Sequence, residues 1–94
     1  MYSLEEETPI TSNRTRVEIL ASVLDVAQHG ALKTHIMYKA NLSHKQLEKY
    51  LGFLKTRGLL EEVPESAESA RFYRVTEKGI QFLKDYARIS GYFD

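Results

Sequence analysis

The sequence predicts a mainly α-helical fold with one small β-hairpin, an α+β domain in which the hairpin follows three helices and precedes a fourth. Long stretches carry apolar residues at helical spacing, whereas two short stretches, LLEEV and RFYRV, break that spacing and flank a loop of small and polar residues. Ninety-four residues allow one modest core and not two. We therefore expect one domain, residues 13–94, preceded by a flexible acidic segment, residues 1–12.

The first helix is predicted from Arg14 to His29, because apolar residues recur there at helical spacing and Gly30 supplies a stop signal. At about 100° per residue these side chains cover about 220° of the helix. One small core cannot use so wide an apolar surface, so part of it is expected to meet a second surface. The narrow polar strip that remains consists of Glu18, Ser22 and Asp25.

A brief second helix is predicted over residues 35–40, after a short hydrophobic link at residues 31–32. Thr34 is the expected cap at its beginning. Asn41 is expected to end the helix, because Asn tolerates the left-handed backbone of a tight turn between helices. Leu42 can fill the corner, so two helices are expected to meet there at a sharp angle.

The third helix is predicted from about His44 to Arg57, with Ser43 as its N-cap and Gly58 as its stop. Its spacing turns one face inward and leaves a polar face that begins with His and Lys. The inward residues are Leu47, Leu51 and Leu54, with Tyr50 beside them.

The hairpin is predicted from residues 59–63 and 71–75, and Thr76 is the expected cap of a last helix, residues 76–90. The apolar residues of this helix fill about 180° of its circumference, more than one core needs. The sequence therefore predicts a three-helix core, a hairpin and a C-terminal dimerisation helix.

This order of elements is the winged helix-turn-helix arrangement. The stretch GALKTHIMYKANLSHKQLEKYLGFLKTRGLLEE, followed by RFYRVTEKGIQFL, resembles the archaeal winged-helix proteins of the small coiled-coil DNA-binding type over residues 14–89. The resemblance implies a dimer in which the helix after the Ser-capped turn reads the major groove and the hairpin acts as the wing. Two differences stand out. The last helix is shorter than the coiled-coil helix of some relatives, and the wing tip, PESAESA, carries Glu65 and Glu68 without Lys or Arg.

The predicted recognition helix, residues 43–57, offers the main candidate DNA contacts. A helix N-terminus is the positive pole of the helix and suits phosphate and base edges. Lysines there can reach guanine or phosphate, and glutamine can pair with adenine. The alternative for the serine is a cap only, and for the lysines ordinary solvated side chains. The expected DNA-binding residues of this helix are Ser43, His44, Lys45, Gln46 and Lys49.

Two further groups complete the expected DNA interface. Lys33, Thr34 and, more weakly, His35 lie at the beginning of the second helix, where such proteins meet the DNA backbone. In the hairpin, Arg71 and Arg74 are the only cations, and they are expected on opposite faces of the strand. Tyr73 shares a face with Arg71 and is expected to pack beneath it.

A homodimer is expected because both terminal helices carry more apolar surface than one chain can bury. In the last helix, Ile80, Leu83 and Ala87 can serve the home core, and a second apolar line faces elsewhere. The alternative is that the first and last helices pack against each other within one chain. The expected dimer residues are Ile19, Val23, Val26, Phe82, Tyr86, Ile89 and Phe93.

The net charge of zero argues against DNA binding, but the distribution of charge along the chain favours it. Residues 14–58 carry eight basic and three acidic side chains, whereas residues 59–94 carry five basic and seven acidic ones. The expected function is therefore that of a dimeric transcription regulator binding double-stranded DNA, specifically or architecturally, in the cytoplasm and associated with the nucleoid. The alternative is a winged-helix protein-interaction module without DNA binding, which the neutral charge and the acidic wing tip favour.

Other chemistries are not expected. The chain has no cysteine, and His29, His35 and His44 form no close ligand pair, so no metal is expected. Ser43 and His44 point about 100° apart on a helix and cannot form a catalytic relay. No phosphate-loop spacing occurs among the five glycines, and no stretch has the length and apolarity of a membrane span. The expectation is a non-enzyme with no cofactor, metal or membrane partner.

Overall fold

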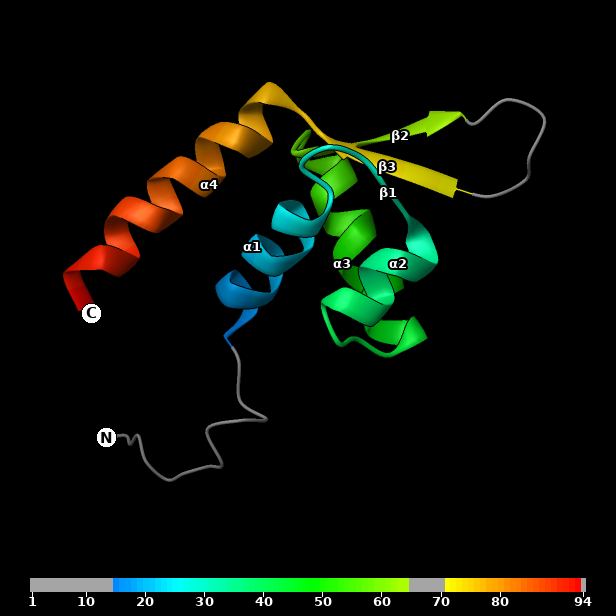
Figure 1. Ribbon diagram of the computed structural model, residues 1–94, viewed down its shortest axis with the longest axis horizontal. Coiled ribbons are helices and arrows are strands. Elements are labelled where there is room, and N and C mark those ends of the chain that lie inside the picture. The colour runs from blue at the N-terminus through cyan, green and yellow to red at the C-terminus, as the bar shows by residue number, and fades with distance from the viewer. Residues whose placement is uncertain (1–14, 65–70, 94) are drawn as a thin grey trace.

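The fold combines four α-helices with a three-stranded antiparallel sheet in the computed structural model, which describes residues 15–64 and 71–93 (Figure 1). This architecture confirms the predicted mainly α-helical fold with its hairpin. The expected flexible segment, residues 1–12, and the wing tip, residues 65–70, lie outside the described residues. The elements are α1 (Arg16–Val26), β1 (Ala31–Leu32), α2 (Lys33–Lys39), α3 (His44–Thr56), β2 (Leu60–Pro64), β3 (Arg71–Val75), α4 (Glu77–Ser90) and a final 3₁₀ turn (Gly91–Phe93).

Helix α1 is shorter than predicted at both ends. It begins at Arg16, because the Thr15 hydroxyl accepts the backbone N–H of Glu18 and the Glu18 carboxylate accepts that of Thr15, a complete capping box. It ends at Val26. The carbonyl of the next residue, Ala27, accepts a hydrogen bond of 3.2 Å from the N–H of Val75 in the sheet, so this carbonyl bonds to the sheet instead of continuing the helix.

The third strand of the sheet is the main correction to the predicted elements. Residues 31–32, expected as a link, form the short strand β1, which pairs antiparallel with β3 in the register Ala31 to Tyr73 and Leu32 to Phe72. Strand β3 therefore lies in the middle of the order β1-β3-β2. A two-residue strand has no period to read in the sequence, so only the tertiary pairing identifies it.

The core lies between the first three helices and the inner face of the sheet. Tyr73 is 2% exposed at its centre, and the Arg71 side chain, beneath which Tyr73 was expected to pack, lies outside the described residues. Alternation along the central strand directs this side chain inward. The largest fully buried side chains besides Tyr73 are Val23, Leu24, Ile36, Leu47 and Leu54.

Helix α4 begins at a polar junction and packs along α1, on the side of α1 away from α2 (Figure 1). The Thr76 hydroxyl accepts the N–H of Gly79 at 3.1 Å, as predicted for an N-cap, and donates to the carbonyl of Gly58 at 2.7 Å. Gly58 ends α3 with a φ of 74°, a left-handed conformation that favours glycine. One hydroxyl thus joins the end of α3 to the beginning of α4.

Candidate nucleic-acid interface

The turn between α2 and α3 fixes the direction of α3. Asn41 has a φ of 57°, and the N–H groups of Asn41 and Leu42 donate to the carbonyls of Tyr38 at 3.2 Å and Met37 at 3.0 Å. This pair of bonds is a Schellman motif with Asn in the left-handed position. Leu42 is buried in the core beside the turn, as predicted. The two helices are therefore held at a defined angle.

The beginning of α3 is closed by a second capping box. The Ser43 hydroxyl accepts the N–H of Gln46 at 3.1 Å, and the Gln46 side-chain oxygen accepts the N–H of Ser43 at 3.0 Å. This bond uses one of the two lone pairs of the Gln46 oxygen, so a two-point pairing of Gln46 with adenine would share that oxygen with the cap. The Ser43 hydroxyl hydrogen and the Gln46 amide hydrogens remain as donors.

The outward face of α3 carries two of the expected lysines. Leu47, Tyr50, Leu51 and Leu54 anchor the opposite face in the core, which leaves Lys45 and Lys49 exposed one helical turn apart. Among residues 15–64 and 71–93, no carboxylate lies within salt-bridge distance of either lysine. Lys49 extends over the Tyr50 ring, 5.8 Å from its centroid. These two cations are therefore available to an anion.

The residues at the beginning of α2 are arranged differently from the prediction. The helix begins at Lys33 directly after β1, and its N-cap is Leu32, which makes no side-chain cap. Thr34 is therefore an exposed residue of the first turn and not the cap, because β1 brings the chain into the helix two residues earlier than expected. His35 is also exposed, as predicted.

Lys33 is held by an acidic residue of α3. Its amine forms a salt bridge with the Glu48 carboxylate, and the Lys33 side chain is 21% exposed. His44 approaches the same carboxylate, with 3.6 Å between its Nε2 and the Glu48 oxygen. Lys33 and His44, both expected to bind DNA, therefore share the Glu48 carboxylate as their partner.

The cations on the sheet side of α3 are paired as well. Arg74 lies 3.5 Å from Glu61 across the β2–β3 pair, and Lys55 of α3 donates to Glu62 at 2.8 Å. Lys55 also extends over the Tyr73 ring at 5.9 Å. The Arg71 side chain lies outside what the structure describes, so only its backbone position at the end of β3 is known. The described part of the wing is therefore close to neutral.

The sequence did not predict the group of cations on the side of α3 that faces α1. Lys49, Phe53 and Arg57 lie four residues apart along α3, and Arg16 of α1 joins them. The Arg57 guanidinium covers the Phe53 ring at 4.6 Å. The regular spacing of the first three residues was visible in the sequence. The position of Arg16 was not, because it depends on how α1 packs against α3.

The expected dimer residues divide into a buried and an accessible group. Val23 is 0% and Ile19 is 8% exposed, because α1 turns both toward the chain's own core, so the structure corrects their assignment to a partner surface. Val26 is half-buried against the core. Phe82 and Tyr86 are half-buried and stack with their rings 6.4 Å apart, while Ile89 is 53% exposed. The Phe93 side chain lies outside the described residues.

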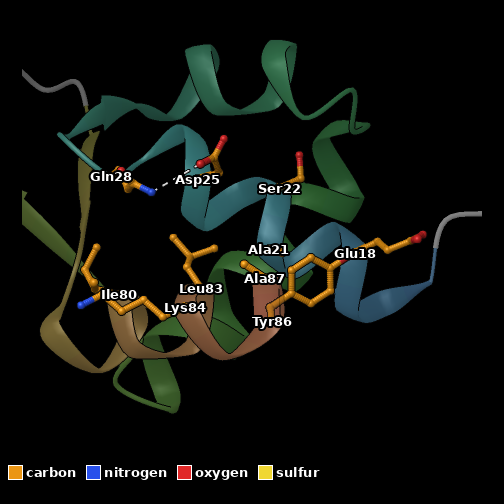
Figure 2. A pocket seen from close by; sticks show the side chains of 10 residues that line it. All are labelled: Glu18, Ala21, Ser22, Asp25, Gln28, Ile80, Leu83, Lys84, Tyr86 and Ala87. Carbon is orange, nitrogen blue, oxygen red and sulfur yellow. Dashed lines mark hydrogen bonds between the residues drawn. The ribbon is translucent and has the colours of Figure 1, made fainter. Parts of the chain in front are cut away.

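Two hollows lie along the contact between α4 and α1. One, of about 650 Å³, has Asp25 and Gln28, joined by a hydrogen bond, on its α1 wall and Ile80 and Leu83 on its α4 wall (Figure 2). The other, of about 870 Å³, lies between the beginning of α1 and the end of α4 and is lined by Val17, Phe82, Tyr86 and Ile89 among others. The packing of α1 against α4 within one chain therefore leaves apolar surface of α4 uncovered.

The described residues also bear on the expectations about metal ions and membranes. In residues 15–64 and 71–93, His, Asp and Glu side chains form no cluster of three that could hold a metal ion. None of the described helices combines the length and the apolarity needed to cross a membrane.

Comparison with known proteins gives one family match and several structural ones. Residues 13–92 match a family model described as winged helix-turn-helix. An uncharacterised protein of the archaeon Methanocaldococcus jannaschii is 34% identical over 56 residues, a match that spans 58% of each protein. Sso10a-2, a DNA-binding protein from Sulfolobus solfataricus, superposes with a TM-score of 0.73 at 24% identity, covering 85% of both chains. The PcaV transcriptional regulator from Streptomyces coelicolor gives a TM-score of 0.69 at 22% identity, covering 80% of this chain and 60% of that one.

Proposed function

The chain belongs to the winged helix-turn-helix family, and on that premise we propose that it is a non-enzymatic DNA-binding protein that regulates transcription by placing α3 in the major groove. One observation carries the proposal. Lys45 and Lys49 are exposed on the outward face of a helix whose opposite face is anchored in the core, and no carboxylate of the described residues pairs with them. The similarity to Sso10a-2, a DNA-binding protein, and to PcaV, a transcriptional regulator, supports the same class.

Helix α3 has the dimensions that this role needs. Its 13 residues give a rod about 20 Å long, and a helix of this width fits the major groove of B-DNA. The Schellman turn at Asn41 orients its N-terminus, so Ser43, His44 and Lys45 reach the DNA first. In the same pose, the beginning of α2, with Lys33, Thr34 and His35, lies beside the DNA backbone. Lys33 contacts a phosphate only after leaving Glu48.

A homodimer is the second part of the proposal. Phe82, Tyr86 and Ile89 form one apolar line on α4, and Val17 of α1, 47% exposed, faces the same hollow. A soluble monomer rarely leaves such a contiguous surface bare. The simplest cover is α4 of a second copy packed about a two-fold axis. Two recognition helices would then address half-sites about one duplex turn apart.

The experiment is a titration of fluorescent duplex DNA at several salt concentrations. Wild-type protein is expected to bind with a negative log–log salt slope, and Lys45→Ala/Lys49→Ala is expected to flatten that slope by about two phosphate contacts. The matched control is Lys84→Ala/Arg88→Ala, which removes the same charge from α4 and should bind as wild type does. Equal slopes for both double variants contradict binding through α3.

One observation favours the alternative function, a protein-interaction module. The cations of the described wing and of the adjoining edge of α3 are paired with carboxylates, unlike those of a wing that grips phosphate. If wild-type protein ignores duplex DNA at low salt, the α3 face is a protein-binding surface and the DNA proposal is wrong.

A further inference from the structure

The cations around α3 are distributed asymmetrically. On the side that faces α2 and the sheet, Lys33, Lys55 and Arg74 each pair with a glutamate. On the side that faces α1, the three cations Arg16, Lys49 and Arg57 have no carboxylate of residues 15–64 or 71–93 within salt-bridge distance. The net positive charge of the α3 region is therefore concentrated on one flank, next to the beginning of α1.

This flank is a continuous strip and not a scatter of surface charges. Lys49, Phe53 and Arg57 are separated by four residues each, so they follow one edge of α3 over about 12 Å. Arg16 approaches from the first turn of α1, and a hollow of about 240 Å³ lies between the two helices. The residues that line it are Arg16, Leu20, Lys49, Tyr50 and Phe53.

Aromatic rings support the cations of this strip. The Arg57 guanidinium lies over the Phe53 ring at 4.6 Å, and the Lys49 amine lies 5.8 Å from the Tyr50 ring centroid. Such contacts restrict a long side chain without neutralising its charge. A cation that is positioned but not paired loses less conformational freedom when it binds an anion than a freely rotating one does.

The chemistry of the strip matches a chain of phosphates. Its length of about 12 Å is enough to meet more than one successive phosphate of a single DNA strand. The strip shares Lys49 with the outward face of α3 and adjoins Lys45, so a duplex that receives α3 brings one strand past it. Glu48, Glu61 and Glu62 all lie on the other side of α3, where they would oppose a phosphate.

We propose that Arg16 and Arg57, together with Lys49, bind the sugar-phosphate backbone of the DNA strand that borders the groove on the α1 side. This inference rests on the proposed function and adds a binding surface to it. DNA is then held by α3 and the first turn of α1, and the described wing contributes little electrostatic affinity. A phosphate lies at the edge of the hollow beside Arg16, and the Phe53 ring packs against sugar while Arg57 reaches the next phosphates.

The test compares single charge removals on the two flanks. Arg16→Gln and Arg57→Gln are titrated with a mixed-sequence duplex of about 30 base pairs, long enough for two half-sites one turn apart. Each is expected to weaken binding about three- to tenfold at low salt and to reduce the log–log salt slope by about 0.9. The matched controls, Lys55→Gln and Arg74→Gln, remove a paired cation from the other flank and should change the slope little.

The outcomes separate the two proposals. Unchanged slopes for Arg16→Gln and Arg57→Gln, beside a flattened slope for Lys45→Ala/Lys49→Ala, overturn the α1-side strip and leave binding through α3 standing. A larger loss for Lys55→Gln or Arg74→Gln overturns it too, because the wing side then carries the affinity. If wild-type protein shows no salt-dependent binding to DNA, both proposals are wrong. Urea unfolding of each variant confirms that a loss of binding is not a loss of fold.

Discussion

Lys33 of α2 and Glu48 of α3 form a salt bridge across the angle between the two helices. The Glu48 carboxylate stands close to where the proposed pose places a phosphate, and His44 lies 3.6 Å from it. Lys33, a proposed DNA contact, is therefore engaged by Glu48 in the free protein. Glu48 is expected to compete with a DNA phosphate for Lys33 and so to limit the affinity of the proposed interface.

Replacing Glu48 with Gln is expected to tighten DNA binding. The change frees Lys33 and removes a negative charge from the face that meets phosphate, and exposed ion pairs of this kind are worth up to about 1 kcal/mol, or about fivefold in affinity. One additional phosphate contact should steepen the log–log salt slope by about 0.9. The control is Asp25→Asn, which removes the same charge from the groove between α1 and α4. Weaker binding by Glu48→Gln would instead indicate that Glu48 contacts a base.

Replacing Gln46 with Glu tests the proposed DNA contact of this residue separately from its role in the cap of α3. Glu serves as well as Gln in a capping box and is favourable near a helix N-terminus, so the free energy of unfolding should change by no more than about 0.5 kcal/mol. The added charge should nevertheless weaken DNA binding, because this turn is proposed to face the duplex. Ser43→Ala, which removes the cap, should instead cost about 1 kcal/mol of stability. DNA affinity equal to wild type in Gln46→Glu would place the duplex elsewhere.

Asn41 is expected to be replaceable by Gly and not by Ala. Its φ of 57° costs a residue with a Cβ about 1–2 kcal/mol unless the side chain tolerates the left-handed region. Asn41→Ala should therefore lower the free energy of unfolding by about 1 kcal/mol, while Asn41→Gly should stay close to wild type. Equilibrium urea unfolding measures both. Equal stabilities for the two variants would contradict a left-handed residue in this turn.

The turn and the caps could be predicted from the sequence because their causes are local. Asn41, Ser43 and Thr76 act on backbone groups within a few residues, so residue type and position suffice. The expected Thr34 cap was wrong for a non-local reason. Strand β1 pairs with β3, which lies about 40 residues further along the chain, and this pairing brings the chain into α2 two residues early.

The candidate site was predictable in its outline and not in its electrostatics. Spacing alone placed Lys45 and Lys49 outward, because the leucines of α3 define its buried face. Which cations are neutralised depends on contacts between elements. Lys33 meets Glu48 from another helix, and Lys55 meets Glu62 from a strand. The α1-side flank needed the position of Arg16, which only the packed helices supply.

Removing the Thr76 hydroxyl is expected to destabilise the junction of α3 and α4. The hydroxyl makes two hydrogen bonds, from the Gly79 N–H and to the Gly58 carbonyl. Thr76→Val keeps the shape but loses both bonds, at a cost of about 1–3 kcal/mol. Thr76→Ser keeps the hydroxyl and should lose much less. Equal thermal stabilities of Thr76→Val and Thr76→Ser would show that the two hydrogen bonds of this hydroxyl add nothing to stability.

Replacing Ile89 with Glu is expected to dissociate the proposed dimer without unfolding the chain. Ile89 is 53% exposed in one chain, so a charge there remains solvated and the stability of the isolated fold should change by no more than about 0.5 kcal/mol. In a dimer joined through α4, the same charge would be buried against Phe82 or Tyr86 of the second copy without a partner, which costs several kcal/mol. Sedimentation equilibrium should therefore give a dimer for wild-type protein and a monomer for Ile89→Glu.

The matched control is Lys84→Gln, which makes the same change in net charge on the other side of α4 and should stay dimeric. Because two linked recognition helices bind two half-sites with an affinity that exceeds that of either alone, Ile89→Glu should also weaken binding to a long duplex much more than to a duplex with room for one helix. A wild-type monomer at micromolar concentration, or a dimer that survives Ile89→Glu, contradicts assembly through this face. In the second case the buried surface must lie elsewhere, because Val23 and Ile19 are already covered within the chain.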